Sequence, residues 1–133
     1  MVDTNFIVQL GEGSITLGML GDALLFPFEL VLPKAVLMEA EALSRREGKV
    51  VSRKAARGLQ LLHRTGFRLA EHEEGLSADK SVIEVSLRLK REGGSVVVAT
   101  SDRELRRRLR RLGVPSLYFR ESEGILEVEW LPP

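Results

Sequence analysis

The stretch VVVATSDRELRRRLRRLGVP, residues 96–115, decides the fold class. It begins with a run of β-branched residues that ends in polar residues, a pattern typical of a strand buried on both faces. It continues with Leu105, Leu109 and Leu112, which stand at helical spacing among arginines. This spacing predicts a helix over 102–112. A buried strand that leads directly into an amphipathic helix indicates a parallel sheet covered by helices.

The rest of the chain repeats this alternation of strands and helices. A short ESEG turn precedes the alternating segment 125–130, which should therefore pair with 116–119 as an antiparallel hairpin. We predict an α/β chain with three layers, α/β/α, in which the central sheet is mainly parallel and ends in a C-terminal hairpin strand. The expected helices are 14–25, 34–47, 52–65, 77–92 and 102–112, and the expected strands are 29–32, 67–70, 95–99, 116–119 and 125–130.

Composition limits the class of protein. The 133 residues suffice for one domain, 1–133, with a core of its own. The absence of cysteine excludes disulfides and thiolate metal sites. No apolar run reaches the roughly 18 residues of a membrane span, and the first residues lack the features of a signal peptide, so we expect a soluble, cytoplasmic protein with no membrane partner. The net charge of +1 provides no general attraction to nucleic acid, but arginines crowd residues 103–111.

Acidic residues stand at the expected ligand-binding edge of the sheet. In parallel α/β sheets, ligands bind beyond the carboxyl ends of the strands. Asp3 and Asp102 each follow an apolar stretch and should lie at this edge. Ser101 and Glu104 have the spacing of a capping box, which predicts Ser101 as the N-cap and leaves Asp102 free at the first helical position.

Two further acidic residues lie on helix faces that should be buried. At roughly 100° per residue, Glu39 falls within the apolar arc of helix 34–47, whereas Glu41 lies opposite and can pair with Arg45. Asp79 lies in the first turn of helix 77–92 and is expected to point inward. Each acid also has an ordinary interpretation, as a turn former, a helix cap, a partner of the helix dipole or an exposed side chain. Taken together, Asp3, Glu39, Asp79 and Asp102 favour a site for a hard divalent cation.

The order of these residues resembles that of the PIN-domain ribonucleases along essentially the whole chain. The segment Thr100–Arg120 is particularly similar to archaeal PIN proteins allied to the ribosomal-RNA-processing endonucleases. The resemblance is carried by Val2-Asp3-Thr4-Asn5, Leu32-Pro33-x-x-Val36-x-x-Glu39, Ala78-Asp79-x-x-Val82-Ile83, and Val98-Ala99-Thr100-Ser101-Asp102-x-x-Leu105 followed by Gly113-Val114-Pro115.

The resemblance implies a PIN-like sandwich and metal-dependent hydrolysis of RNA phosphodiester bonds. One or two Mg²⁺ or Mn²⁺ ions would be held by the four acids, which serve as both metal ligands and catalytic residues. Thr100 and Ser101 would support the site through their hydroxyls, and Asn5 would orient Asp3. The arginine helix has two interpretations, a solvated surface or a phosphate-binding surface. In the second, the substrate-binding residues would be Arg103, Arg106 and Arg107.

Several functional alternatives stay open at this stage. The main one is a catalytically silent PIN scaffold that binds RNA or a protein partner. A phosphoacceptor receiver domain fits poorly, because Asp3 is followed by Thr-Asn rather than by a second acid. For a nuclease, the role is either RNA processing, with a ribosome-assembly partner, or that of a toxin held by an antitoxin. The resemblance also suggests a homodimer, for which the apolar segment 15–31 would provide a surface.

Overall fold

The computed structural model describes residues 1–131, so the last two residues of the predicted domain lie outside the described part. Helices and strands alternate as expected for an α/β chain. The elements in chain order are α1 (Thr4–Glu12), α2 (Leu17–Leu24), β1 (Val31–Pro33), α3 (Lys34–Ser44), α4 (Val50–Thr65), β2 (Arg68–Ala70), α5 (Ala78–Arg91), β3 (Val98–Ala99), α6 (Arg103–Arg111), β4 (Ser116–Arg120) and β5 (Ile125–Glu129).

The sheet is held together by the first residues of the chain. Val2 forms a parallel bridge with Ala99, and its N–H donates to the Val31 carbonyl at 3.3 Å. Residues 1–3 therefore lie between β1 and β3 and join two strand groups into the order β2, β1, residues 1–3, β3, β4, β5. The pairs β1–β2 and β3–β4 are parallel, and β4–β5 is the antiparallel hairpin that the turn pattern predicts.

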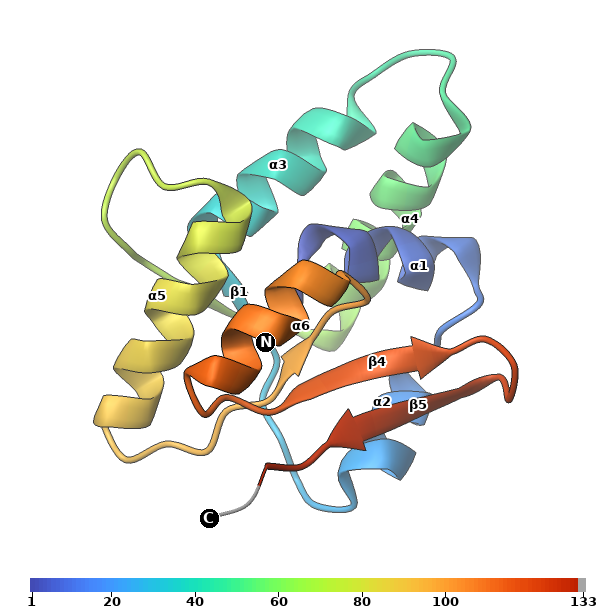
Figure 1. The fold of residues 1–133 in the computed structure, drawn as a ribbon. Helices are drawn as coiled ribbons and strands as arrows, with labels where there is room; N and C mark the ends of the chain where they lie inside the picture. The colour runs from blue at the N-terminus through green and yellow to red at the C-terminus, as the bar shows by residue number, and fades with distance from the viewer. Residues whose placement is uncertain (132–133) are drawn as a thin grey trace.

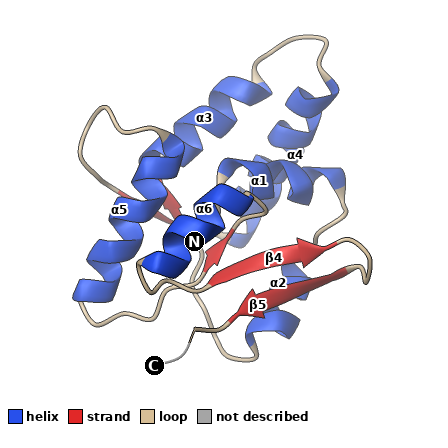
Figure 2. Cartoon of the chain, in the orientation of Figure 1, coloured by secondary structure: helices blue, strands red, loops and turns tan. Residues whose placement is uncertain are grey.

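Helices cover both faces of this sheet. Figure 1 shows α5 and α6 in front of the strands and α1, α2 and α4 behind them. Figure 2 shows the same three layers by type of element, with the strands in the middle. The predicted α/β/α sandwich with a mainly parallel sheet is thus confirmed.

The largest error in the predicted elements is at the start of the chain. Residues 4–12 form α1, which the sequence patterns did not indicate, and the helix expected over 14–25 is reduced to α2. Asp3 caps α1 by accepting a hydrogen bond from the Phe6 N–H at 2.8 Å. A helix therefore begins at Thr4, directly after the residues that lie between β1 and β3.

Close packing of α1 against α4 forms the rear layer. A Cβ atom added to Gly58 would lie 2.0 Å from the Ile7 carbonyl oxygen, and one added to Gly11 would lie 1.7 Å from the Lys54 carbonyl oxygen. The two backbones meet because neither glycine has a side chain. Phe6 and Ile7 are fully buried beside this contact and fix α1 in the core.

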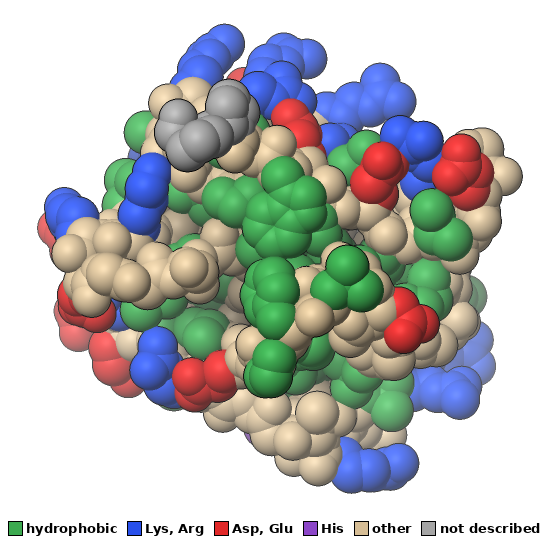
Figure 3. Space-filling model, turned by 90° about the horizontal axis from the view of Figure 1, so that it is seen from below, with side chains coloured by type: hydrophobic (Ala, Val, Ile, Leu, Met, Phe, Trp, Pro, Cys, Tyr) green, Lys and Arg blue, Asp and Glu red, His purple; other side chains and the backbone are tan. Residues whose placement is uncertain are grey.

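The lower end of the molecule carries an apolar surface. Figure 3 shows hydrophobic side chains gathered near the middle of this face. Leu25, Phe26, Phe28 and Trp130 are exposed there, and the rings of Phe26 and Trp130 lie 6.1 Å apart. No helix within residues 1–131 combines the length and apolar character needed to cross a membrane.

Candidate functional site

Asp3 is a buried carboxylate at the carboxyl end of the central strand. Its side chain is 4% exposed. The pKa of Asp3 is raised from 3.8 to about 6. Burial is the main cause and the charges of Asp79 and Asp102 add to it, whereas hydrogen bonds from the Thr100 hydroxyl and the Phe6 N–H act in the opposite direction. A proton or a cation at this position would offset the cost of the buried charge.

Asp102 is the N-cap of α6, so the predicted capping by Ser101 is wrong. Its Oδ1 accepts hydrogen bonds from the N–H groups of Glu104 at 2.9 Å and Leu105 at 3.1 Å. The Thr100 Oγ1 accepts from the Asp102 N–H at 3.1 Å and holds the turn between β3 and α6. One oxygen of the Asp102 carboxylate caps the helix, and the second takes no part in these cap hydrogen bonds.

Asp79 and Glu39 are more exposed than predicted. Asp79 lies in the first turn of α5, which Ser77 caps, and its side chain is exposed rather than directed into the core. Glu39 is also exposed, because α3 buries Val36 and Ala40 and turns its other faces outward. The predicted burial of both acids is therefore wrong.

The four acids nevertheless gather in one region. Partial burial raises the pKa of Asp79 above its ordinary value, and the charges of Asp102 and Glu39 raise it further. Asp79 and Asp102 in turn raise the pKa of Asp3. Four elements of the fold thus bring acids together near the carboxyl edge of the sheet, as the topological rule predicts.

The donors in this region suit a hard divalent cation. Mg²⁺ and Mn²⁺ prefer carboxylate and water oxygens, and a cation would offset the mutual repulsion of the acids. The Thr4 hydroxyl, beside Asp3 in the chain, is buried and lacks a hydrogen-bond partner among residues 1–131. Within the same residues, no three His, Asp or Glu side chains already form a cation-binding group. The chemistry of the donors fits the metal.

The predicted supporting residues have different positions. Thr100 is fully buried and contacts both Asp3 and Asp102, as described above. The Ser101 hydroxyl lies 3.4 Å from the Gln9 Oε1 and so contacts α1. Asn5 is exposed, and its side chain makes none of the hydrogen bonds found within the described residues.

The arginines of α6 separate into distinct groups. Arg106 packs its guanidinium 3.6 Å from the centre of the Tyr118 ring and pairs with Glu129 at 3.0 Å. Because these contacts direct Arg106 toward the hairpin, it is poorly placed to bind substrate beside the acids. Arg103 and Arg107 are exposed and have no ion pair within residues 1–131.

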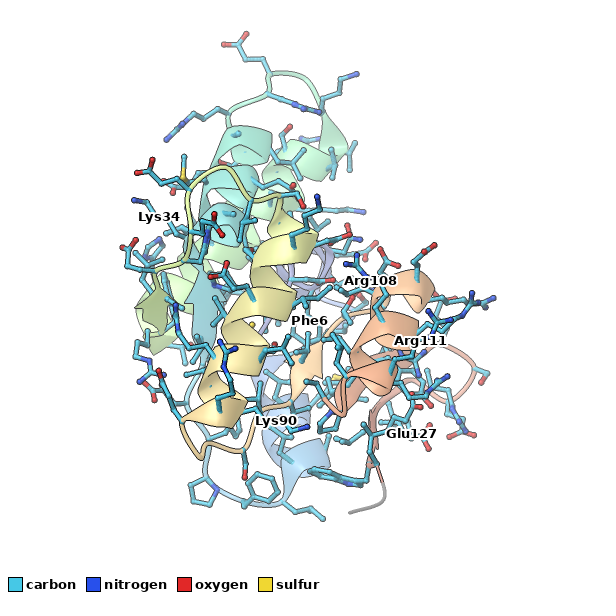
Figure 4. The ribbon with its side chains drawn as sticks, turned by 60° about the vertical axis from the view of Figure 1, so that its left-hand side comes forward. Phe6, Lys34, Lys90, Arg108, Arg111 and Glu127 are labelled. Carbon is cyan, nitrogen blue, oxygen red and sulfur yellow. The ribbon has the colours of Figure 1, made fainter. Side chains whose placement is uncertain are left out.

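Arg108 lies nearer to the acids and was not among the predicted substrate residues. Its charge lowers the pKa of Asp79. Figure 4 shows Arg108 on the side of α6 that faces α5, with Arg111 on the outer side. Six arginines surround the leucines of this helix, so the sequence alone gave no signal that separates Arg108 from its neighbours.

The two histidines lie outside the acidic region. The His72 Nε2 accepts a hydrogen bond from the Ala35 N–H at 2.9 Å, which caps the start of α3. Its Nδ1 lies 2.9 Å from the Glu73 carbonyl oxygen and donates to it. His63 is exposed in the last turn of α4 and packs on the Phe67 ring. Both roles are structural.

A hollow of about 630 Å³ lies at the other end of the sheet. It is lined by residues that precede the strands, including Met1, Leu30 and Val97, and by Phe26 and Phe28. The candidate site and this apolar hollow therefore occupy opposite edges of the sheet.

Comparisons with known proteins agree with this architecture. The sequence profile of a family described as "PIN like domain" matches residues 1–122. A solved structure titled "Structure of the PIN domain endonuclease Utp24" superposes with a TM-score of 0.73 at 24% identity, covering 98% of this chain and 90% of that chain. No curated protein sequence gives a significant match. The match over residues 1–122 shows that the chain belongs to the PIN-like domain family.

Proposed function

We propose that this chain is a metal-dependent endoribonuclease that hydrolyses RNA phosphodiester bonds with Mg²⁺ or Mn²⁺. Membership of the PIN-like family supports the nuclease class, and the endonuclease of similar fold is consistent with it. The observation that carries the proposal is Asp3, a carboxylate that is 4% exposed and whose pKa is raised to about 6 by burial and by neighbouring acids. Asp3 also caps α1, and a bound cation would offset the cost of its buried charge.

The residues divide the work as follows. Asp3, Asp79 and Asp102 would hold the metal, with Glu39 at the outer side of the cluster. A bound divalent cation neutralises charge on the scissile phosphate and provides an activated water. Thr100 keeps Asp3 and Asp102 in place through its hydroxyl. Arg108, close to Asp79, would bind a non-bridging phosphate oxygen beside the acids.

One observation favours the alternative of a silent RNA-binding scaffold. Within residues 1–131, the acids do not form a ready-made cation-binding group. A scaffold would retain the fold and RNA affinity and would not cut RNA. The two functions therefore differ in cleavage and metal binding, whereas both predict RNA binding.

Cleavage of an end-labelled structured RNA separates these functions. The purified chain would be assayed with Mn²⁺, Mg²⁺ or EDTA, together with Asp102→Asn and Asp79→Asn. Asparagine caps helices as well as aspartate does, so Asp102→Asn should keep its melting temperature. We expect metal-dependent cleavage that falls by at least about tenfold in both variants, because even mutation of groups that only support metal ligands costs about 10–100-fold.

Asp22→Asn is the matched control, because Asp22 is an exposed aspartate on α2, outside the acidic cluster. It should cleave like the wild type. Cleavage that persists in Asp102→Asn would contradict the proposed site. RNA binding without any cleavage by the wild type would instead identify the chain as a scaffold.

A further inference from the structure

The corner between α3 and α4 contains a second hollow, lined largely by charged residues. It has a volume of about 470 Å³ and is lined by the loop that joins the two helices and by the first turns of α4. Figure 1 shows this corner at the upper end of the molecule, at the end of the helix that carries Glu39. Four of its lining side chains are cationic and one is acidic, namely Arg45, Arg46, Lys49 and Arg53 against Glu47.

The cations of this corner are largely without internal partners. Arg45 pairs with Glu41 at 3.7 Å across an exposed surface, which is a weak contact. Arg46, Lys49 and Arg53 form no ion pair within residues 1–131. Their charges are therefore available to an external anion.

The start of α4 strengthens the attraction for an anion. Lys49 is the N-cap of this 16-residue helix and provides no side-chain cap, and the first turn contains no acidic residue. The positive end of the helix dipole and the first N–H groups of α4 therefore have no acidic partner in the first turn of the helix.

Ser52 is the independent sign of a missing ligand. Ser52 is one of the residues that line the hollow and is 3% exposed, and its buried hydroxyl has no hydrogen-bond partner among residues 1–131. A buried hydroxyl without a partner costs free energy. An anionic oxygen in the hollow would accept a hydrogen bond from the Ser52 hydroxyl and so remove that cost.

We propose that this corner binds two phosphates of the RNA backbone, as contacts separate from the acidic cluster. The inference rests on the proposed function for the identity of the polymer. Glu39 and Ser44 are five residues apart on α3, which corresponds to about 8 Å along the helix axis. A strand whose phosphodiester lies at the acids can therefore extend along α3 to reach the corner.

Binding of a labelled single-stranded RNA, measured by fluorescence anisotropy in EDTA, tests the proposal without cleavage. The variant Lys49→Gln/Arg53→Gln should bind the RNA about tenfold more weakly. The slope of log K against log salt concentration should also be shallower by about 1.4, because two phosphate contacts are lost. The control Arg64→Gln/Arg91→Gln removes the same charge from exposed helix ends elsewhere. It should bind like the wild type.

Ser52→Ala separates binding from folding. Removing a buried hydroxyl that has no partner should leave the melting temperature unchanged or higher, whereas RNA affinity should fall about threefold. A titration with inorganic phosphate, followed by amide NMR, should shift the Val50 and Val51 signals in the wild type.

The outcomes are distinct. Equal affinities for the corner and control variants would overturn the proposal. Phosphate-induced shifts with unchanged RNA affinity would also overturn it and would indicate a phosphorylated ligand of another class. Weaker binding by the corner variant in a chain that never cleaves RNA would support this site and contradict the proposed nuclease function instead.

Discussion

Asp3 has two roles whose energies oppose each other. Its carboxylate accepts the Phe6 N–H and so caps α1, which stabilises the fold. The same carboxylate is buried near Asp79 and Asp102, which destabilises its charged form. Replacing the charge while keeping the cap separates these two effects.

Asp3→Asn should therefore stabilise the metal-free chain at pH 8. A pKa raised from 3.8 to about 6 means that the folded state binds more protons than the unfolded state between these values. Stability is thus lost as the pH rises through about 6. The full shift is equivalent to about 3 kcal/mol, so we expect a gain of about 2 kcal/mol at pH 8 in urea unfolding with EDTA. The gain should vanish near pH 4.

When the wild type and Asp3→Asn are compared at the same pH, the contributions of other titrating groups to the free energy of unfolding cancel. Burial lowers the pKa of the Met1 amino group to about 6, so this group changes stability in the opposite sense between about pH 6 and 8. A wild type that is as stable as Asp3→Asn at pH 8 would show that Asp3 is not destabilised by burial.

The pKa of Asp3 also predicts how metal affinity depends on pH. Carboxylates bind metals in their deprotonated form, so metal and proton compete for Asp3. As the pH rises toward 6, the apparent Kd for Mn²⁺ should fall by up to about tenfold per pH unit, and it should level off above pH 7. Isothermal titration calorimetry between pH 5 and 8 measures this. A Kd independent of pH would place the metal away from Asp3.

The residues at the site show where sequence patterns are sufficient and where they fail. Placing Asp3 and Asp102 at one edge needed only the rule for parallel strands. Choosing between Ser101 and Asp102 as the cap did not follow from sequence, because both have the chemistry and the backbone turn after Thr100 decides. Glu39 was misplaced because α3 buries a narrower face than its apolar residues suggest.

At the scale of elements, the crossing of α1 and α4 depends on two glycines. Gly58→Ala should lower the free energy of unfolding by about 3 kcal/mol, because the new Cβ would lie 2.0 Å from the Ile7 carbonyl oxygen and the helices must separate. Gly21→Ala is the control, since no atom lies within 4 Å of a Cβ at that position in α2. It should raise stability by about 0.5–1 kcal/mol. Thermal unfolding with matched buffers distinguishes the two, and equal effects would contradict the close contact.

The cap that His72 provides for α3 is a long-range contact with a local effect. His72→Ala should lower stability by about 1 kcal/mol, because the Ala35 N–H loses its acceptor and Pro33, the N-cap, has no side-chain cap to offer. His63→Ala, on the exposed end of α4, should change it by less than about 0.5 kcal/mol. Urea midpoints at constant m-value measure both. A larger loss for His63→Ala would refute the assigned roles.

Element prediction succeeded where one pattern dominated. The arginine helix and the C-terminal hairpin each carry a strong local period, and the structure confirms them. The strand predicted over 95–99 is confirmed only at Val98–Ala99. Helix α1 was missed because Thr4–Glu12 mixes β-branched residues with a glycine, and its helical state depends on packing against α4. Tertiary contact, rather than propensity, makes it a helix.

At the scale of the whole molecule, local charge should control RNA binding. The net charge is +1, yet the outer face of α6 and the α3–α4 corner each present exposed cations without ion pairs in the described chain. If both contact single-stranded RNA through about five or six phosphates, log K should fall with log salt at a slope near −4. Anisotropy titrations from low to moderate KCl measure it. A slope shallower than about −1 would exclude backbone contacts at both surfaces.

The short central strand has a consequence for the timing of assembly. Residues 1–3 pair with residues 97–99, and the Met1 amino group donates to the Val97 carbonyl across 96 positions of the chain. Closing such a long loop is slow compared with forming the α1–α4 contact. Asp102 follows β3, the strand that pairs with residues 1–3. A chain fragment that ends before residue 97 would carry three of the four acids and still lack the arrangement, so the candidate site forms only when the sheet closes.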